Sequence, residues 1–409
     1  MKKFFKALSL FGLLIASVIF GLVFLEGLKI PDEINILEGD SQLVSNVPRT
    51  AAYVNSYKSV STRGSGGGSY VLDFKLLKTI PIKSSSVTVR QRRYVVPGGE
   101  AFGLKLYSDG VMAVGFDEVL DGGVKICPGR EAGLEAGDVI TALDGKRVTR
   151  SAELIGYLKS ATKSSVRLSV SRDGKPFETE LSLVRTQDGA GNKAGLWIRD
   201  STAGVGTLTY YRRDNMSFAG LGHAVCDVDT GRVIPLLYGD AVGAVISGCY
   251  KSEGSVTGEL CGVFTVEKLG DIVFNRENGV YGTVKKIPSD RKEIPVASKQ
   301  EVHPGEAEII STVNGNTTER FSIKIVRICN SQDKNGKNFT LKVTDDRLLE
   351  KTGGIVQGMS GSPIIQDGML AGAVTHVFVN DPTQGYGIFA ENMLEISDSI
   401  AARQNSKAS

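Results

Sequence analysis

The sequence predicts a mainly β protein of several domains, with one apolar helix at its amino terminus. Glycine is abundant, with 49 residues in a chain of 409, and many short Val/Ile/Thr runs are separated by turn residues, which favours strands over helix bundles. Apolar residues make up 41% of the chain, so it can bury hydrophobic cores instead of staying disordered. A length of 409 residues predicts two or three domains at roughly 100–200 residues each.

The amino terminus, residues 1–27, is expected to be a membrane anchor. Lys2, Lys3 and Lys6 precede an apolar run from about Leu8 to Leu25. This run is about long enough to span a bilayer, and the basic residues before it would hold the start of the chain in the cytoplasm. A cleaved secretion signal is the alternative, but the run is long and no A-x-A site closes it. Both interpretations place the rest of the chain outside the cytoplasm.

Residues 28–94 are expected to form a linker and an N-terminal region of mixed composition. The stretch 61–69 is rich in Gly and Ser, which is typical of a flexible linker.

Charge and cysteine content exclude several function classes. The net charge is only +3 and no basic stripe is present, so nucleic acid is not an expected partner. The five cysteines are odd in number and lack a C-x-x-C pair, so neither a disulfide scaffold nor a zinc site is predicted. We expect no metal and no cofactor.

Residues 95–188 are expected to form a compact β unit that resembles a known binding module. The sequence A-G-L-x-A-G-D-V-I at residues 132–140, followed by Asp144-Gly145, resembles the PDZ domains attached to bacterial proteases. The resemblance implies binding of an extended peptide, whose terminal carboxylate is held by backbone N–H groups. The matching loop is expected at Val114, Gly115 and Phe116. The alternative is that the glycine only bends a strand.

Residues 189–405 are expected to form an all-β barrel or sandwich that carries a nucleophile loop. Gly358-Met359-Ser360-Gly361-Ser362-Pro363 has the G-x-S-G-x-P form of trypsin-like peptidases. Glycines allow a tight turn that exposes the Ser360 hydroxyl, and the N–H groups of Gly358 and Ser360 would form an oxyanion hole. A Gly/Ser turn between strands is the structural alternative.

A nucleophilic serine needs a base, and the chain offers only three histidines. His223 lies in a Gly-rich turn before an apolar stretch and precedes the serine, as in trypsin-like enzymes, so it is the preferred base. His376 lies on the strand after Ser360 and is expected to line a specificity pocket if it is not the base. His303 lies in a polar stretch and is expected to be exposed.

The acid that orients the base is less clear from the residues alone. Trypsin-like spacing favours Asp271. The other aspartates considered between base and nucleophile are Asp227, Asp229, Asp240, Asp345 and Asp346.

Three segments of the C-terminal half, 220–231, 352–363 and 372–386, closely resemble the SpoIVB family of signalling serine peptidases from endospore-forming bacteria. The resemblance places the catalytic roles on His223, Asp345 and Ser360. Asp345 lies fifteen positions before the serine, a spacing unlike that of ordinary trypsin-like enzymes. It could instead lie under the nucleophile loop and hold it rigid, with Asp271 as the rival acid.

The family resemblance also implies a setting in the intermembrane space of the forespore. Such proteins cut themselves near the N-terminus and then cleave a membrane-bound inhibitor of an intramembrane protease, which activates a late mother-cell sigma factor. The PDZ domain would control self-recognition and recognise the target. Two other functions are weighed against this one: a non-catalytic PDZ scaffold at the membrane, and a cysteine peptidase using Cys226.

Overall fold

The computed structural model describes residues 2–30, 32–37, 59–60, 69–76, 80–185, 191–254, 256–329 and 336–408. The chain divides into two compact units, residues 1–93 and 94–409. The expected flexible linker falls largely on residues 61–68, which lie outside the described residues. Short alternating runs form strands throughout, so the prediction of a mainly β protein is confirmed.

The first unit holds one long helix and a small sheet. Helix α1 (Lys2–Lys29) is followed by four strands in the order β1-β4-β3-β2: β1 (Glu33–Leu37), β4 (Ile80–Arg90), β3 (Ser69–Leu76) and β2 (Ser59–Val60). The apolar run that was expected to span a membrane lies in α1. Within the described residues, no helix has both the length and the apolarity needed to cross a membrane.

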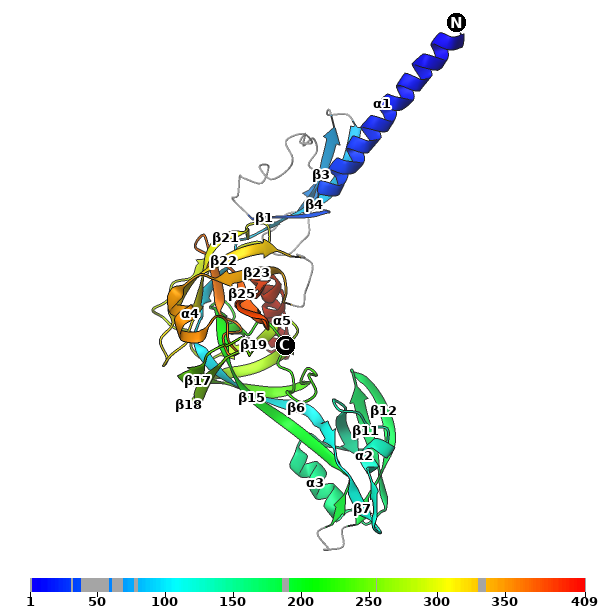
Figure 1. The fold of residues 1–409 in the computed structure, drawn as a ribbon, viewed down its shortest axis with the longest axis vertical. Helices are drawn as coiled ribbons and strands as arrows, with labels where there is room; N and C mark the ends of the chain where they lie inside the picture. The colour runs from blue at the N-terminus through cyan, green and yellow to red at the C-terminus, as the bar shows by residue number, and fades with distance from the viewer. Residues whose placement is uncertain are drawn as a thin grey trace. The chain divides into compact units, whose positions relative to one another are not determined.

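The second unit contains two six-stranded antiparallel barrels (Figure 1). In the first barrel, successive neighbours pair from β6 around to β15, which pairs with β6 again. Its strands in this order are β6 (Ala101–Phe116), β17 (Leu236–Tyr250), β18 (Glu259–Arg276), β19 (Gly279–Val284), β16 (Ser217–Gly220) and β15 (Leu196–Arg212). Phe102, Leu106, Phe218 and Ile272 are among the residues of its buried core. Closure leaves few exposed strand edges.

The second barrel closes in the order β21-β22-β23-β26-β25-β24. These strands are β21 (Gly305–Ser311), β22 (Glu319–Ile328), β23 (Phe339–Val343), β26 (Asp381–Phe389), β25 (Met369–Phe378) and β24 (Pro363–Gln366). Strand β22 shows the period-two pattern: Phe321, Ile323 and Ile325 are buried and the residues between them are exposed. Two helices accompany this barrel, α4 (Asp346–Thr352) and α5 (Ala390–Ala408).

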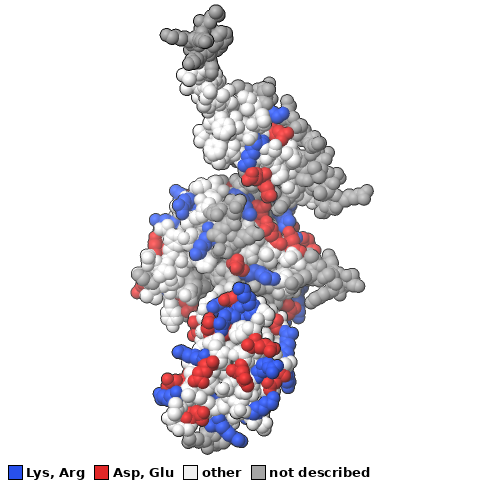
Figure 2. All heavy atoms as spheres, turned by 90° about the vertical axis from the view of Figure 1, so that its right-hand side faces the viewer, with Lys and Arg blue, Asp and Glu red and all other residues white. Residues whose placement is uncertain are grey.

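The region expected to be a PDZ domain forms a small lobe whose strands continue the sheet of the first barrel. Its strands are β9 (Val139–Leu143), β10 (Lys146–Arg147), β11 (Ser165–Arg172) and β12 (Lys175–Ser182), and its helices are α2 (Pro128–Glu131) and α3 (Ser151–Ser160). Leu143, Leu154 and Leu168 are buried in its core. On the face that Figure 2 shows, side chains of both charges are interspersed over the lower part of the molecule.

The strand at the start of the expected PDZ region is shared with the first barrel. The first half of β6 pairs with β15 and β17 inside the first barrel, while its second half pairs with β9 in the lobe. Strand β5 (Tyr94–Pro97) also pairs with β15 at Tyr210 and Tyr211. The lobe is therefore an insertion carried by the long β6–β15 pair, which Figure 1 shows as two strands running side by side. The sequence could not show this insertion, because the single strand β6 belongs to both the first barrel and the lobe.

Candidate active site

The predicted nucleophile and the preferred base come from different barrels. Ser360 lies in the loop between α4 and β24, just before this strand of the second barrel begins. His223 lies in the turn after β16 of the first barrel. A cavity of about 640 Å³ opens beside them and is lined by His223, Gly358 and His376, together with residues of β15 and β18. Two of the three histidines therefore face the cavity that borders the nucleophile loop.

Two hydrogen bonds from one residue of β15 hold the nucleophile loop in place. Thr207 donates its N–H to the Ser360 carbonyl at 3.0 Å and its hydroxyl to the Gly358 carbonyl at 2.8 Å. The Ser360 hydroxyl donates to the Thr375 carbonyl at 2.8 Å. This last bond is broken when the hydroxyl turns toward a base, so the structure shows a resting nucleophile. Catalytic hydrogen bonds often form only when substrate is bound.

The two amides predicted to stabilise an oxyanion are free of protein acceptors within the described chain. The carbonyls that share their peptide groups are bound on the opposite side: Gln357 accepts from Leu260 N–H at 2.9 Å and Met359 from Ser362 N–H at 2.9 Å. A trans peptide points its N–H away from its carbonyl. The N–H groups of Gly358 and Ser360 are thereby left for a ligand, as an oxyanion hole requires.

His223 is held in the tautomer that a general base needs. Its Nδ1 lies 2.8 Å from the Ala224 carbonyl oxygen, and because a carbonyl only accepts, Nδ1 carries the hydrogen and Nε2 the lone pair. Burial lowers the pKa of His223 below its usual value, against a smaller raising effect of the Ala224 carbonyl. Asn275 fixes the backbone of Val225, two residues after His223. Its side chain accepts from the Val225 N–H at 2.8 Å and donates to the Val225 carbonyl at 2.9 Å.

The ring of His376 lies beside the ring of His223. The two ring centroids are 5.2 Å apart. Burial, and next the charge of His223, lower the pKa of His376 to about 4, so the ring is neutral at ordinary pH. Its buried Nδ1 finds no hydrogen-bond partner in the described part of the chain. His303, in contrast, is exposed and pairs with Asp367 at 2.9 Å, as its polar surroundings predicted.

Neither predicted acid contacts His223. The Asp345 side chain caps α4, accepting from the N–H groups of Arg347 at 3.0 Å and Ser322 at 3.1 Å. The Arg347 guanidinium hydrogen bond lowers the pKa of this carboxyl most. Asp271 is 60% exposed and pairs with Lys268 at 2.7 Å. In this structure the Asp345 oxygens cap the start of α4 and do not bond His223, so the assignment of Asp345 as the orienting acid stays a prediction.

Asp345→Ala should lower the free energy of unfolding by about 1–2 kcal/mol, the usual cost of a lost helix N-cap. Turnover should fall far less than the roughly 10⁴-fold loss that follows when a true orienting acid is changed. Urea denaturation and kcat are measured on the same samples. Asp346→Ala is the matched control, since Asp346 is the exposed neighbour that caps nothing. A thousand-fold loss of kcat in a stable Asp345→Ala protein would restore the acid role.

Cys226 lines the same cavity but is not an activated nucleophile. Burial first, and then the charge of Asp227, raise the pKa of its thiol. A reactive cysteine needs a lowered pKa because the thiolate is the attacking species. The cysteine-peptidase alternative therefore loses its chemical basis.

The residues predicted to form the peptide-binding loop of the lobe lie at the end of β6, beside β15. Gly115 pairs with Trp197, and Phe116 pairs with Leu196, so β15 already covers this edge of β6. Val114 lies in the same covered run. A second cavity, of about 390 Å³, opens between α3 and the run of Gly195 with the first three residues of β15, Leu196–Ile198. A peptide strand can be added only at an uncovered edge, so this cavity is the candidate that the structure offers for the peptide site.

Sequence reasoning missed the residues that act through their backbone or through distant pairing. Thr207, Thr375 and Ala224 support the site with a hydroxyl, an amide or a carbonyl, and none of them belongs to a motif. The run Gly195-Leu196-Trp197-Ile198 does carry a signal, since a glycine followed by consecutive apolar residues is consistent with a turn that leads into a buried strand.

Solved structures and curated proteins give partial likenesses. The PDZ domain of the SdrC-like protein of Listeria monocytogenes is 25% identical, covering 22% of this chain and 87% of that one, with a TM-score of 0.18. The Rv3671c protease of M. tuberculosis in its active form is 13% identical, covering 47% and 72%, with a TM-score of 0.28. A Treponema pallidum protein named "Putative zinc metalloprotease" is 46% identical over 59 residues, which is 14% of this chain and 13% of that protein.

Two family models match the chain itself. Residues 121–172 match the PDZ domain, which agrees with the lobe of α2, β9 and α3. Residues 190–394, half of the chain, match the SpoIVB peptidase S55 family and include His223, Asp345 and Ser360. The chain therefore belongs to the SpoIVB S55 family of serine peptidases and carries a PDZ domain.

Proposed function

We propose that this protein is a signalling endopeptidase that cuts itself and then a membrane-bound regulatory protein during endospore formation. Cleavage of that regulator would release an intramembrane protease and activate a late mother-cell sigma factor. The observation that carries the catalytic part is a tautomer-fixed His223 on the cavity that the nucleophile loop borders, where the amides of Gly358 and Ser360 are unbound. The biological setting rests on family membership.

The reaction is acyl transfer. Ser360 Oγ leaves the Thr375 carbonyl, attacks a substrate peptide carbonyl and passes its proton to Nε2 of His223. The amides of Gly358 and Ser360 stabilise the negative charge on the substrate oxygen. The imidazolium then protonates the leaving amine, and water hydrolyses the acyl-enzyme with His223 again as base. Because no described carboxylate touches His223, the Ala224 carbonyl supports the charged ring through Nδ1–H.

The proposal places the second unit outside the cytoplasm, in the space between the two forespore membranes. The basic residues Lys2, Lys3 and Lys6 before the apolar part of α1 support export. Attachment through this segment would hold the peptidase close to a membrane-bound substrate. The PDZ lobe would recognise that substrate or another copy of the chain.

The test is labelling and self-cleavage of the full chain with Ser360→Ala as the inactive variant. A fluorophosphonate probe should label the wild type and not Ser360→Ala, because only an activated serine reacts. Mass spectrometry over hours should find a wild-type cut before residue 94 that Ser360→Ala lacks. Ser399→Ala, a change at an exposed hydroxyl of α5, is the matched control and should behave as the wild type.

Each outcome decides something about the proposal. Equal labelling of wild type and Ser360→Ala would remove Ser360 as the nucleophile. Labelling without self-cleavage would keep the peptidase and overturn the self-processing step. Identical cuts in both proteins would assign the cleavage to another enzyme.

A further inference from the structure

Strand β15 has one edge that stays open over a long stretch. Its first edge pairs with β6 from Leu196 to Thr207. Its second edge pairs with β16 only from Leu208 to Arg212. Within the described residues, no strand covers the second edge between Leu196 and Gly206. Uncovered strand edges of this kind are templates for pairing with another extended chain.

The catalytic cavity and the cavity beside α3 both open on this edge. Residues 202–205 of β15 line the catalytic cavity, and residues 195–198 line the cavity beside α3. Side chains of a strand alternate between faces, so a cavity over one face would be lined by every second residue. Four consecutive residues of β15 line the catalytic cavity and three line the cavity beside α3, so each cavity borders the strand's edge. The peptidase site and the PDZ groove therefore lie along the same edge.

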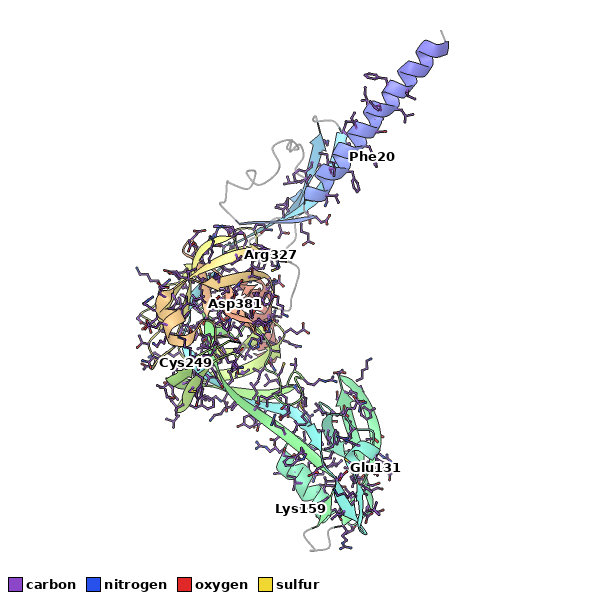
Figure 3. All side chains as sticks on the ribbon, in the orientation of Figure 1. Phe20, Glu131, Lys159, Cys249, Arg327 and Asp381 are labelled. Carbon is purple, nitrogen blue, oxygen red and sulfur yellow. The ribbon has the colours of Figure 1, made fainter. Side chains whose placement is uncertain are left out.

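The groove beside α3 has the chemistry of a carboxyl-terminal peptide site. Helix α3 contributes Leu154, Ile155 and Leu158, which give an apolar wall. Gly195 has a φ of +62° and starts the strand with a turn, the kind of backbone that directs N–H groups at a carboxylate. The side chains of Lys159, labelled on α3 in Figure 3, and Lys193 add positive charge, beside the acidic Asp117 and Glu118.

Strand β15 also links the groove beside α3 to the segment that carries His223. Asp200, between the two cavities, accepts the N–H of Ser151 at 2.7 Å and so attaches the start of α3 to β15. Its neighbour Arg199 forms ion pairs with Asp227 and Asp229, in the segment that follows His223. The groove and the base are thereby tied to adjacent residues of one strand.

An antiparallel peptide on this edge has a defined direction. With its carboxyl end at Leu196, its upstream residues run toward Arg199 and then toward the cleft at residues 202–205. Strand residues advance about 3.3 Å each, so the stretch from Leu196 to Val205 is roughly 30 Å, or about nine extended residues.

The carboxyl end of a peptide, which PDZ domains bind, would lie in the groove between α3 and Leu196–Ile198. We propose that β15 sets the distance from that end to the cleaved bond. This inference rests on the proposed peptidase function. The substrate class is then an exposed, extended tail with an apolar terminal residue. The bond that Ser360 attacks lies about ten residues before the terminus.

The experiment uses the full chain and a peptide library of about 20 residues, long enough to reach both cavities. The peptides have random sequence and end in valine, either as the free acid or as the amide. Mass spectrometry maps every cut as a distance from the carboxyl end, and a fluorophosphonate probe measures the active fraction. Free-acid peptides should be cut mostly within about two residues of one distance, whereas cuts in amidated peptides should scatter.

Ile155→Glu is the groove variant, because it puts a negative charge into the groove at a side chain that is 41% exposed. It should be labelled normally and should lose the fixed distance. Val124→Glu is the matched control on strand β8 (Val124–Ile126), 64% exposed and outside the groove. It should cut as the wild type.

The outcomes separate this inference from the function beneath it. Absence of both cutting and Ser360 labelling overturns the peptidase, and the measuring role with it. Full labelling with scattered wild-type cuts overturns only the fixed distance. Clustering that survives amidation, or that survives Ile155→Glu, overturns the carboxyl-end groove.

Discussion

Replacing His223 with alanine should lower kcat by on the order of 10⁴–10⁶-fold, the range seen when a triad histidine is lost. Only the Nε2 lone pair of this ring is free to accept a proton, because Nδ1–H is bonded to the Ala224 carbonyl. The change in KM should be small, since the ring acts in the transition state and contributes little to ground-state binding. Steady-state kinetics on samples normalised by folded fraction measure both quantities.

The pH profile gives a second reading of the same assignment. Burial lowers the pKa of His223, so the base stays neutral, and the enzyme active, as the pH falls below the ordinary histidine pKa of about 6.5. The acid limb of kcat/KM should therefore lie below that value. His376, with a pKa of about 4, is neutral over this range. Both rings are harder to protonate in the folded state than in the unfolded state. The free energy of unfolding should therefore fall as the pH drops from about 6.5 toward 4.

His303→Ala is the matched control for the base, because this histidine is exposed and lies away from the cavity. It should keep wild-type turnover. If His376→Ala abolishes turnover while His223→Ala retains it, the base is the other ring of the pair. An acid limb at or above 6.5 would show that the base is not held in its buried, neutral form.

The catalytic pair was predictable because its signals are short and local. The loop around Ser360 must turn tightly and expose a hydroxyl, and this requirement appears as glycines within six consecutive residues. His223 could be found by elimination among three histidines, helped by the glycines of its turn. Chemistry of this kind leaves a pattern that does not depend on the rest of the fold.

The remaining features depended on pairings that no local pattern encodes. Gly115 looked like a ligand-binding bend, but its edge is covered by Trp197, far away in sequence. Asp345 has a spacing that fits the family's acid, yet helix α4 begins at the next residue and uses the carboxylate as its cap. In both cases the sequence marks a residue with a particular structural role. That role is determined by another element, β15 for Gly115 and α4 for Asp345.

Gly361→Ala should destabilise the second unit by at least about 3 kcal/mol, because two penalties add there. The residue has a φ of +95°, which L side chains rarely adopt. A Cβ atom would also lie 2.0 Å from the Thr207 carbonyl oxygen and 2.4 Å from the Leu221 nitrogen, both backbone atoms. The clash would push β15 away from the nucleophile loop and weaken the bonds from Thr207 that hold it.

Gly368→Ala separates these two penalties. Gly368 also has a positive φ, +76°, but a Cβ there meets nothing within 4 Å, so it should cost only the roughly 1–2 kcal/mol of left-handed backbone. Denaturation midpoints by circular dichroism, with fluorophosphonate labelling at each step, compare the two variants. Gly361→Ala should lose labelling well before the midpoint of Gly368→Ala. Equal midpoints would mean that β15 and the nucleophile loop do not approach this closely, and the argument that Thr207 holds the oxyanion amides in place would fail with them.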